Sequence, residues 1–160
     1  MEKNFDGWNE RKKSIDKPES LADFHEREIW WCSIGVNVGS EQHSQTSDFS
    51  RPILIVRKFT RDVFWGIPLT TKTKDIDFRM RFILEGIEND LLILQMRVYD
   101  RKRLTRKIGV MPKSDFAELT DIIKNLLYNE TPACAGFSEA EANVYSHLSI
   151  LIPCVNKVLF

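Results

Sequence analysis

The chain has 160 residues, of which 42% are hydrophobic and 29% are charged, enough for one buried core and too few for two of ordinary size. Its 23 Lys and Arg balance its 23 Asp and Glu, and a net charge of zero argues against a protein that holds nucleic acid through bulk charge alone. We therefore expect a single domain with short appendages.

A β-rich centre is predicted between two helical segments. Residues 4–15, NFDGWNERKKSI, fit a short helix that presents Phe5 and Trp8, and a linker with a proline follows. Residues 27–36 alternate in polarity and carry aromatic side chains, which is typical of a strand, and a polar loop follows them. Further strands are predicted near residues 51–60, 63–71, 76–85, 90–99 and 106–111. Short strands at this spacing favour a small barrel or a sandwich.

The helix predicted after the strands starts next to Pro112, a residue type that is favoured in the first helical turn. Apolar side chains then recur at helical spacing, at Phe116, Leu119, Ile123, Leu126 and Leu127. We expect this amphipathic helix to lie on the barrel, so the predicted fold class is mainly β, of the α+β type. In the C-terminal tail, residues 138–141 have a capping-box pattern that predicts a last helix.

Cysteine usage and the two ends of the chain indicate the compartment. Cys32, Cys134 and Cys154 are widely spaced and include no C-x-x-C pair, which favours a reducing compartment and predicts no zinc site. The first residues lack the apolar region of a secretory signal, and the apolar C-terminal tail is interrupted by polar residues and too short to span a bilayer. We expect a cytoplasmic protein with no metal and no cofactor.

Positive charge is concentrated in one run of the sequence. Residues 97–107, RVYDRKRLTRK, hold six Lys and Arg and a single acidic residue, Asp100. Such a density suits a phosphate backbone, although a run of charges is more often a solvated strand edge. Asp100 is interpreted as a structural partner of Arg97 or Arg103 and not as a base.

Four stretches, in this order, resemble the PemK/MazF toxins of type II toxin-antitoxin systems: REIWWCSIGVNVGSEQ, RPILIV, GIPLTTK and LQMRVYDRKRLTRKIG. The resemblance extends over about residues 27–127 and separates a toxin-like domain (27–128) from an N-terminal extension (1–26) and a C-terminal extension (129–160). It implies an SH3-like barrel, a homodimer and a metal-independent endoribonuclease that cuts single-stranded RNA, including mRNA, at short sequences. It also implies a cognate antitoxin, whose acidic segment we expect to lie across residues 97–107.

Arg51 is the first candidate catalytic residue. Cutting RNA without a metal requires hydrogen-bond donors for the negative charge that builds on the phosphate in the transition state. Arginine suits this role because its planar, permanently charged fork matches two phosphate oxygens. The resemblance places the family's arginine at Arg51, before Pro52. The alternative is an end-of-strand charge that reaches solvent or pairs with Asp48.

A predicted strand end, PLTTK, and a loop stretch, GSEQ, supply further candidates. Thr70 matches the threonine or serine that the family places beside the arginine, where a hydroxyl can hold a phosphate oxygen; the alternative is a plain β-forming residue. Thr71 and Lys72 follow it and are predicted RNA contacts. Glu41 is a candidate catalytic base in the GSEQ motif, or a solvated loop residue, and His43 is a weaker candidate that could titrate near neutral pH.

Gln95 and Arg97 also match the family pattern. We interpret Gln95 as a base-edge or structural amide and Arg97 as a contact to the RNA backbone. One branch of the family carries a histidine before the EQ pair and an arginine and an aspartate before the glutamine, where this chain has Ser40, Leu92 and Leu94. The acid-base pair of that branch is therefore excluded, and the predicted chemistry depends on the arginine and threonine above.

Two functions of different classes remain open. The first is an endoribonuclease toxin, and the alternative is a non-catalytic barrel that binds RNA or a protein target such as a topoisomerase. Arg51 together with Thr70 separates the two, because a pure binder does not need both. Trp30, Trp31 and Trp65 are interpreted as core or dimer-interface residues more readily than as stacking platforms for bases.

Overall fold

The computed structural model describes residues 3–17, 21–44, 48–74 and 78–128, so the helix predicted near 138–141 lies outside the described residues. The elements, in chain order, are α1 (Phe5–Ile15), β1 (Glu28–Ser33), β2 (Ser50–Lys58), β3 (Val63–Thr70), β4 (Arg79–Leu84), β5 (Ile87–Leu92), the 3-10 turn η1 (Ile93–Gln95), β6 (Arg97–Asp100), the 3-10 turn η2 (Arg101–Arg103), β7 (Leu104–Val110) and α2 (Lys113–Tyr128). All strands belong to one compact unit, Met1–Lys124.

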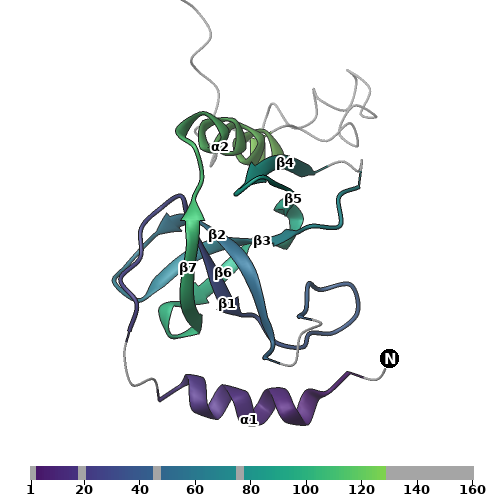
Figure 1. The fold of residues 1–160 in the computed structure, drawn as a ribbon, viewed down its shortest axis with the longest axis vertical. Coiled ribbons are helices and arrows are strands. Elements are labelled where there is room, and N and C mark those ends of the chain that lie inside the picture. Colours follow the sequence, from purple (N-terminus) through teal and green to yellow (C-terminus); the bar gives the residue numbers. More distant parts are fainter. Residues whose placement is uncertain (1–2, 18–20, 45–47, 75–77, 129–160) are drawn as a thin grey trace, which may run out of the picture. The chain divides into compact units, whose positions relative to one another are not determined.

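The strands form one antiparallel sheet in the order β4-β5-β3-β2-β1-β7, and β6 also pairs with β3. β3 changes partner along its length, because residues 63–66 pair with β6 whereas Leu69 and Thr70 pair with β5. Register shifts in the β1–β7 and β2–β3 pairs mark bulges, which bend and twist strands. The result is the curved sheet of Figure 1, which brings the end of β3 close to β2, β4 and β5.

Alternation along the strands places one set of side chains inside the curved sheet. The core cluster consists of Phe24, Trp30, Cys32, Ile34, Ile53, Ile55, Phe64, Tyr99 and Leu104. Trp30 is therefore a core residue, as predicted, while Trp65 is half-buried with its ring edge-on to Phe59 at 4.9 Å between centroids. Leu119 and Ile123 of α2 are buried as well, as the amphipathic pattern indicated. Among the described residues, no helix has the length and apolar character that a membrane span requires.

The single strand predicted over residues 90–99 is wrong. The chain instead leaves β5 at Leu92, turns through η1 and resumes as β6. The backbone N–H of Met96 donates to the carbonyl of Ile93 at 3.0 Å and closes this turn. Neither glycine nor proline marks the turn in the sequence LLILQMR, so its apolar residues read as a continuous strand. The break allows β5 and β6 to pair with different ends of β3.

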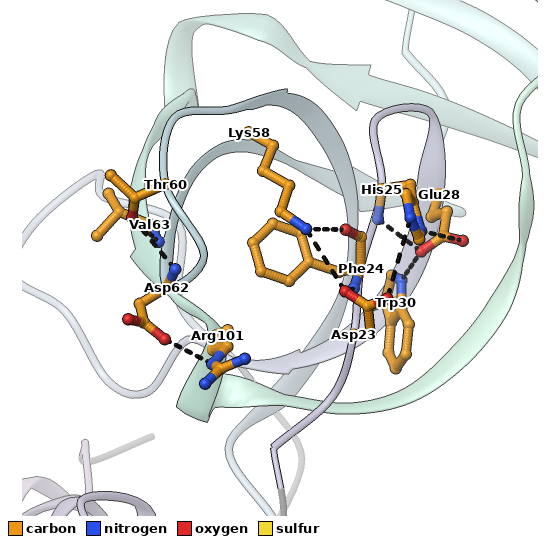
Figure 2. Close-up of polar contacts among 10 residues, drawn as sticks. All are labelled: Asp23, Phe24, His25, Glu28, Trp30, Lys58, Thr60, Asp62, Val63 and Arg101. Atoms are coloured by element: carbon orange, nitrogen blue, oxygen red, sulfur yellow. Dashed lines mark hydrogen bonds and ion pairs between the residues drawn. The ribbon is translucent and has the colours of Figure 1, made fainter.

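Glu28 anchors the start of β1 (Figure 2). One of its carboxylate oxygens accepts hydrogen bonds from the indole N–H of Trp30 at 2.9 Å and from the backbone N–H of His25 at 3.0 Å. The other accepts from Nζ of Lys107 in β7 at 2.6 Å. Burial works to raise the pKa of Glu28, but the hydrogen bonds from Lys107 and Trp30 outweigh it and leave the pKa below its ordinary value. The charged carboxylate thus links β1 to β7.

α1 is the short helix predicted over residues 4–15, and it is docked on the rest of the compact unit. Asn4 caps it by accepting the Gly7 N–H at 2.8 Å. Trp8 is buried, with its ring 5.6 Å from the Phe49 ring and the Arg103 guanidinium 5.6 Å from the indole. Just after the helix, Asp16 forms an ion pair with Lys102 at 3.0 Å. These contacts make α1 part of the folded unit.

Gly35 makes room for Trp8, and this leads to a prediction. Its φ of +81° favours glycine, and a Cβ at this position would collide with the indole ring. Gly35→Ala should therefore lower the free energy of unfolding by about 1–3 kcal/mol and expose α1 to trypsin at Arg11, Lys12 and Lys13. Chemical denaturation and limited proteolysis measure the two effects.

Gly39→Ala is the matched control, because Gly39 also has a positive φ, +55°, but a Cβ there would meet nothing within 4 Å. It should introduce backbone strain while leaving α1 resistant to trypsin. Equal proteolysis of α1 in the two variants would contradict a specific role of Gly35 in seating Trp8.

Candidate functional site

A surface cavity of about 540 Å³ lies where the start of β2, the end of β3 and the start of β4 meet. Its walls come from β1, the β1–β2 loop, β2, β3, the residues after β3, β4 and β5. The lining residues are Trp31, Gln42, Ser44, Ser50, Arg51, Pro52, Leu69, Thr70, Thr71, Lys72, Lys74, Arg79, Asn89 and Leu92. Four of the predicted site residues, Arg51, Thr70, Thr71 and Lys72, are therefore brought together.

Strand register explains why Arg51 and Thr70 meet. Ile53 of β2 pairs with Pro68 of β3, so Arg51 and Thr70 follow two residues beyond that pair on facing strands. Residues opposite one another in an antiparallel pair point to the same side of the sheet. Ile53, two residues from Arg51, is fully buried in the core, so Arg51 stands at the rim of the same face.

Arg51 is held in place but keeps unused donors. Its Nη1 donates to the carbonyl of Leu69 at 3.1 Å, which fixes the side chain against the end of β3. Its Nε is buried and finds no hydrogen-bond partner among the described residues. Burial lowers the pKa of Arg51 from its ordinary value, yet a guanidinium remains charged at any physiological pH. The pairing with Asp48 that the sequence left open is replaced by this bond to the β3 backbone.

The cavity is strongly cationic. Its described lining residues include Arg51, Lys72, Lys74 and Arg79, and none of them is a carboxylate. Such an arrangement attracts an anion and offers several donors to phosphate oxygens. Trp31 also lines the cavity and is half-buried, so the expectation that it is a core or interface residue is incomplete.

Thr70 ends β3 in a tight local turn. Its Oγ1 accepts the backbone N–H of Lys72 at 3.2 Å, and its hydroxyl proton remains available for an acceptor in the cavity. This hydrogen bond holds the Thr70 side chain against the backbone of the residues that follow it. The plain β-forming role is therefore not the whole of its structural contribution.

Gln95, Glu41 and His43 lie outside the cavity wall. The side-chain Oε1 of Gln95 accepts the backbone N–H of Gln42 at 2.9 Å, and its Nε2 lies 3.4 Å from the carbonyl of Ser40, so the structural-amide interpretation describes its contacts. Glu41 is exposed, one residue before Gln42, which does line the cavity. His43 Nδ1 lies 3.4 Å from the carbonyl of Glu41.

The basic run over residues 97–107 is largely engaged within the protein, whereas the sequence left open a phosphate-binding surface or a solvated strand edge. Arg97 and Arg103 donate to the carbonyls of Ile34 and Ser33 at 3.2 and 3.0 Å. Arg101 pairs with Asp62 at 2.6 Å (Figure 2). Lys102 and Lys107 pair with Asp16 and Glu28, as described above.

Asp100 also differs from its predicted role. Its carboxylate accepts the backbone N–H of Lys102 at 2.8 Å and caps η2, so its described hydrogen bond is not to the guanidinium of Arg97 or Arg103. It is structural, as expected, through a different partner. Sequence alone cannot distinguish a free cation from a paired one when the pairing carboxylate lies far away along the chain.

The sequence interpretation missed Lys74, Arg79 and Asp90. Lys74 and Arg79 line the cavity, and Asp90 contacts both from β5. The signal that could have found Asp90 is a carboxylate directly before a fully apolar strand end, DLLIL, because a buried charge needs partners.

Other reactive groups do not form a second site among the described residues. The described part of the chain holds no group of three or more His, Cys, Asp or Glu arranged to bind a metal. Burial raises the pKa of the Cys32 thiol to about 12, so Cys32 stays protonated and is unsuited to nucleophilic attack.

A family model described as PemK-like, MazF-like toxin of type II toxin-antitoxin system matches residues 25–127, more than half of the chain. The chain belongs to this family. The resemblance read from the four sequence stretches is thereby confirmed, and the matched region contains the whole cavity wall. The helix α1 lies before the matched residues, outside the region that the family model describes.

A solved structure supports the fold of this toxin-family chain. MazF from Deinococcus radiodurans (Form-I) is 19% identical with a TM-score of 0.52, and the alignment covers 68% of this chain and 98% of that one. The likeness confirms the mainly β, SH3-like fold with a C-terminal helix. Toxin MazF-mt6 from Mycobacterium tuberculosis is 17% identical, with a TM-score of 0.49 and coverages of 66% and 100%. A comparison with curated protein sequences finds no match.

Proposed function

We propose that this toxin-family protein is an endoribonuclease that cuts single-stranded RNA, including mRNA, by attack of the RNA's own 2′-OH and without a metal ion. The observation that carries the proposal is the cavity in which Arg51 and Thr70 face one another among cations, with no carboxylate on the described wall. Cations without carboxylates favour binding of a phosphate. The described wall offers no carboxylate that could coordinate a metal ion or activate a water nucleophile.

Five residues of the cavity wall have a role in this mechanism. Arg51 donates to the phosphate oxygens as negative charge builds in the transition state, and the Thr70 hydroxyl holds one of these oxygens. Thr71 and Lys72 contact the RNA backbone on the same side. The indole of Trp31 provides a surface on which a base can stack.

The remaining candidates act from outside the cavity wall. Gln95 holds the loop that contains Gln42 and so shapes one wall. Arg97 holds the carbonyl of Ile34, so a contact between its guanidinium and RNA would require a different rotamer. Glu41 is exposed on the loop, and a base at this position would have to approach the RNA from that loop.

The partners follow from the family and from the proposed substrate. We propose that a cognate antitoxin binds the protein, that the toxin pairs as a homodimer, and that both act in the cytoplasm where mRNA is found. Because five of the six Lys and Arg in residues 97–107 have described partners within the protein, the cationic cavity is the better match for an acidic antitoxin segment.

End-group mapping tests the proposed reaction. Purified protein incubated with mixed-sequence RNA in excess EDTA should produce fragments that end in a 2′,3′-cyclic phosphate and begin with a 5′-hydroxyl. Fragments with 5′-phosphate ends, or cleavage that EDTA stops, would contradict the 2′-OH mechanism. Binding of RNA with no cleavage would favour the non-catalytic barrel.

A further inference from the structure

Asp90 is a buried carboxylate beside the cavity that is not part of its wall. It lies in β5 and is only 1% exposed. It pairs in register with Thr70 of β3 on one side and with Arg81 of β4 on the other. Its position between the two strands places it where the residues after β3 and the first residue of β4 come together.

The contacts of Asp90 join two parts of the cavity wall. Its Oδ2 accepts the backbone N–H of Lys74 at 2.8 Å and lies 3.5 Å from Nη1 of Arg79. Its Oδ1 accepts from Nε of Arg81 at 3.1 Å. Nη1 of Arg79 also lies 3.3 Å from the carbonyl of Lys72. A single carboxylate therefore holds the segment that follows Thr70 and the arginine that starts β4.

The carboxylate is suited to be a fixed anchor. Burial works to raise the pKa of Asp90, but the hydrogen bonds from the Lys74 backbone and from Arg81 outweigh it and leave the pKa below its ordinary value. Asp90 is thus ionised at neutral pH and only accepts hydrogen bonds. With three donors around it, it is poorly placed to take a proton from RNA.

We propose that Asp90 is a positioning residue that sets Lys72, Lys74 and Arg79 around the cavity for binding of the RNA backbone, without touching the RNA itself. The inference rests on the proposed function, because it assigns a role within the same site. Like charges repel, and the Asp90 carboxylate offsets the charge of Arg79 while it holds the backbone at Lys74. Lys72 is held indirectly, through the bond from Arg79 to its carbonyl.

Replacing Asp90 distinguishes a role in positioning the cations from an effect of its negative charge alone. If Asp90 acted only through its charge, Asp90→Asn would make the site more positive and tighten binding of a polyanion. If it positions the cations, the same change should weaken binding, because an asparagine cannot accept from Lys74, Arg79 and Arg81 together.

The probe is a short, labelled, mixed-sequence RNA with 2′-O-methyl groups, measured by fluorescence anisotropy. For Asp90→Asn we expect the Kd to rise about 10-fold and the dependence of binding on salt to become shallower. On cleavable RNA, KM should rise by a similar factor with kcat changed by less than about 3-fold, because Arg51 and Thr70 keep their places. Glu88→Gln is the matched control: it removes a carboxylate from an exposed residue of the same strand and should not weaken binding.

An unchanged or lower Kd for Asp90→Asn would overturn the proposal. Hydrogen exchange of the wild-type protein provides a test that does not depend on the variant's folding, since the Lys74 N–H should be protected; exchange as fast as in an exposed loop would also overturn it. The binding measurement needs no cleavage. Wild-type protein that binds the probe but does not cut RNA would therefore refute the endoribonuclease proposal and leave the role of Asp90 to be decided by the Kd values.

Discussion

Arg51→Ala should slow RNA cleavage by about 10²- to 10³-fold, the effect of removing one charged donor aimed at the transition state. The loss should appear in kcat, because Lys72, Lys74 and Arg79 still line the cavity and in the proposed complex hold the RNA backbone. Arg51 stands at the rim of the sheet, and among the described residues its side chain donates to the carbonyl of Leu69, so the variant should stay folded. Single-turnover cleavage rates with saturating protein measure the effect.

Two further variants control the interpretation. Arg57→Ala removes an exposed arginine from the same strand, one that pairs with Glu26 at 3.6 Å, and should cut at the wild-type rate. Arg51→Lys keeps the charge without the planar fork and should recover only part of the lost rate. Wild-type cleavage by Arg51→Ala would show that the transition-state donor lies elsewhere.

The central strands of the fold and the meeting of Arg51 with Thr70 could both be predicted from the sequence, because both depend on the order of strands along the chain. Arg51 precedes a continuous apolar strand and Thr70 ends the next one, so an antiparallel pairing with a short turn necessarily brings the two residues near each other. This pairing joins strands that are neighbours in the sequence, so it does not depend on contacts between distant parts of the chain. Thr71 and Lys72 follow directly in the chain and therefore line the same cavity, while their contact with RNA stays a prediction.

The unpredicted features depend on contacts between residues that are distant in the sequence. The basic run looked open because the carboxylates that pair with it, Asp16, Glu28 and Asp62, are between 39 and 86 residues away. Asp90 meets Lys74 and Arg79 only after β5 has paired with β4 and β3. Local sequence patterns record periodicity and turn residues, but they do not indicate which distant carboxylate will pair with a given lysine or arginine.

A single 2′-deoxy substitution at the nucleotide whose 2′-OH attacks should abolish cleavage at that bond, because the proposed reaction then has no nucleophile. The described cavity wall supports this expectation: it offers Arg51, Lys72, Lys74 and Arg79 to the phosphate, but no carboxylate to activate water or to hold a metal ion. The measurement is cleavage of an RNA oligonucleotide and of a series of copies, each with one deoxynucleotide, after the cut site has been mapped.

The effect should be confined to one position of the series. A deoxynucleotide on the far side of the scissile bond removes the same kind of hydroxyl but leaves the nucleophile, so these copies should be cut at a rate close to that of the parent RNA. The uncut copy should still compete with the parent RNA for the protein, because in the proposed complex Lys72, Lys74 and Arg79 contact phosphates that the substitution does not alter. Cleavage of the copy that lacks the attacking 2′-OH would require an external nucleophile, and the mechanism built on Arg51 and Thr70 would then have to be replaced by one that activates water.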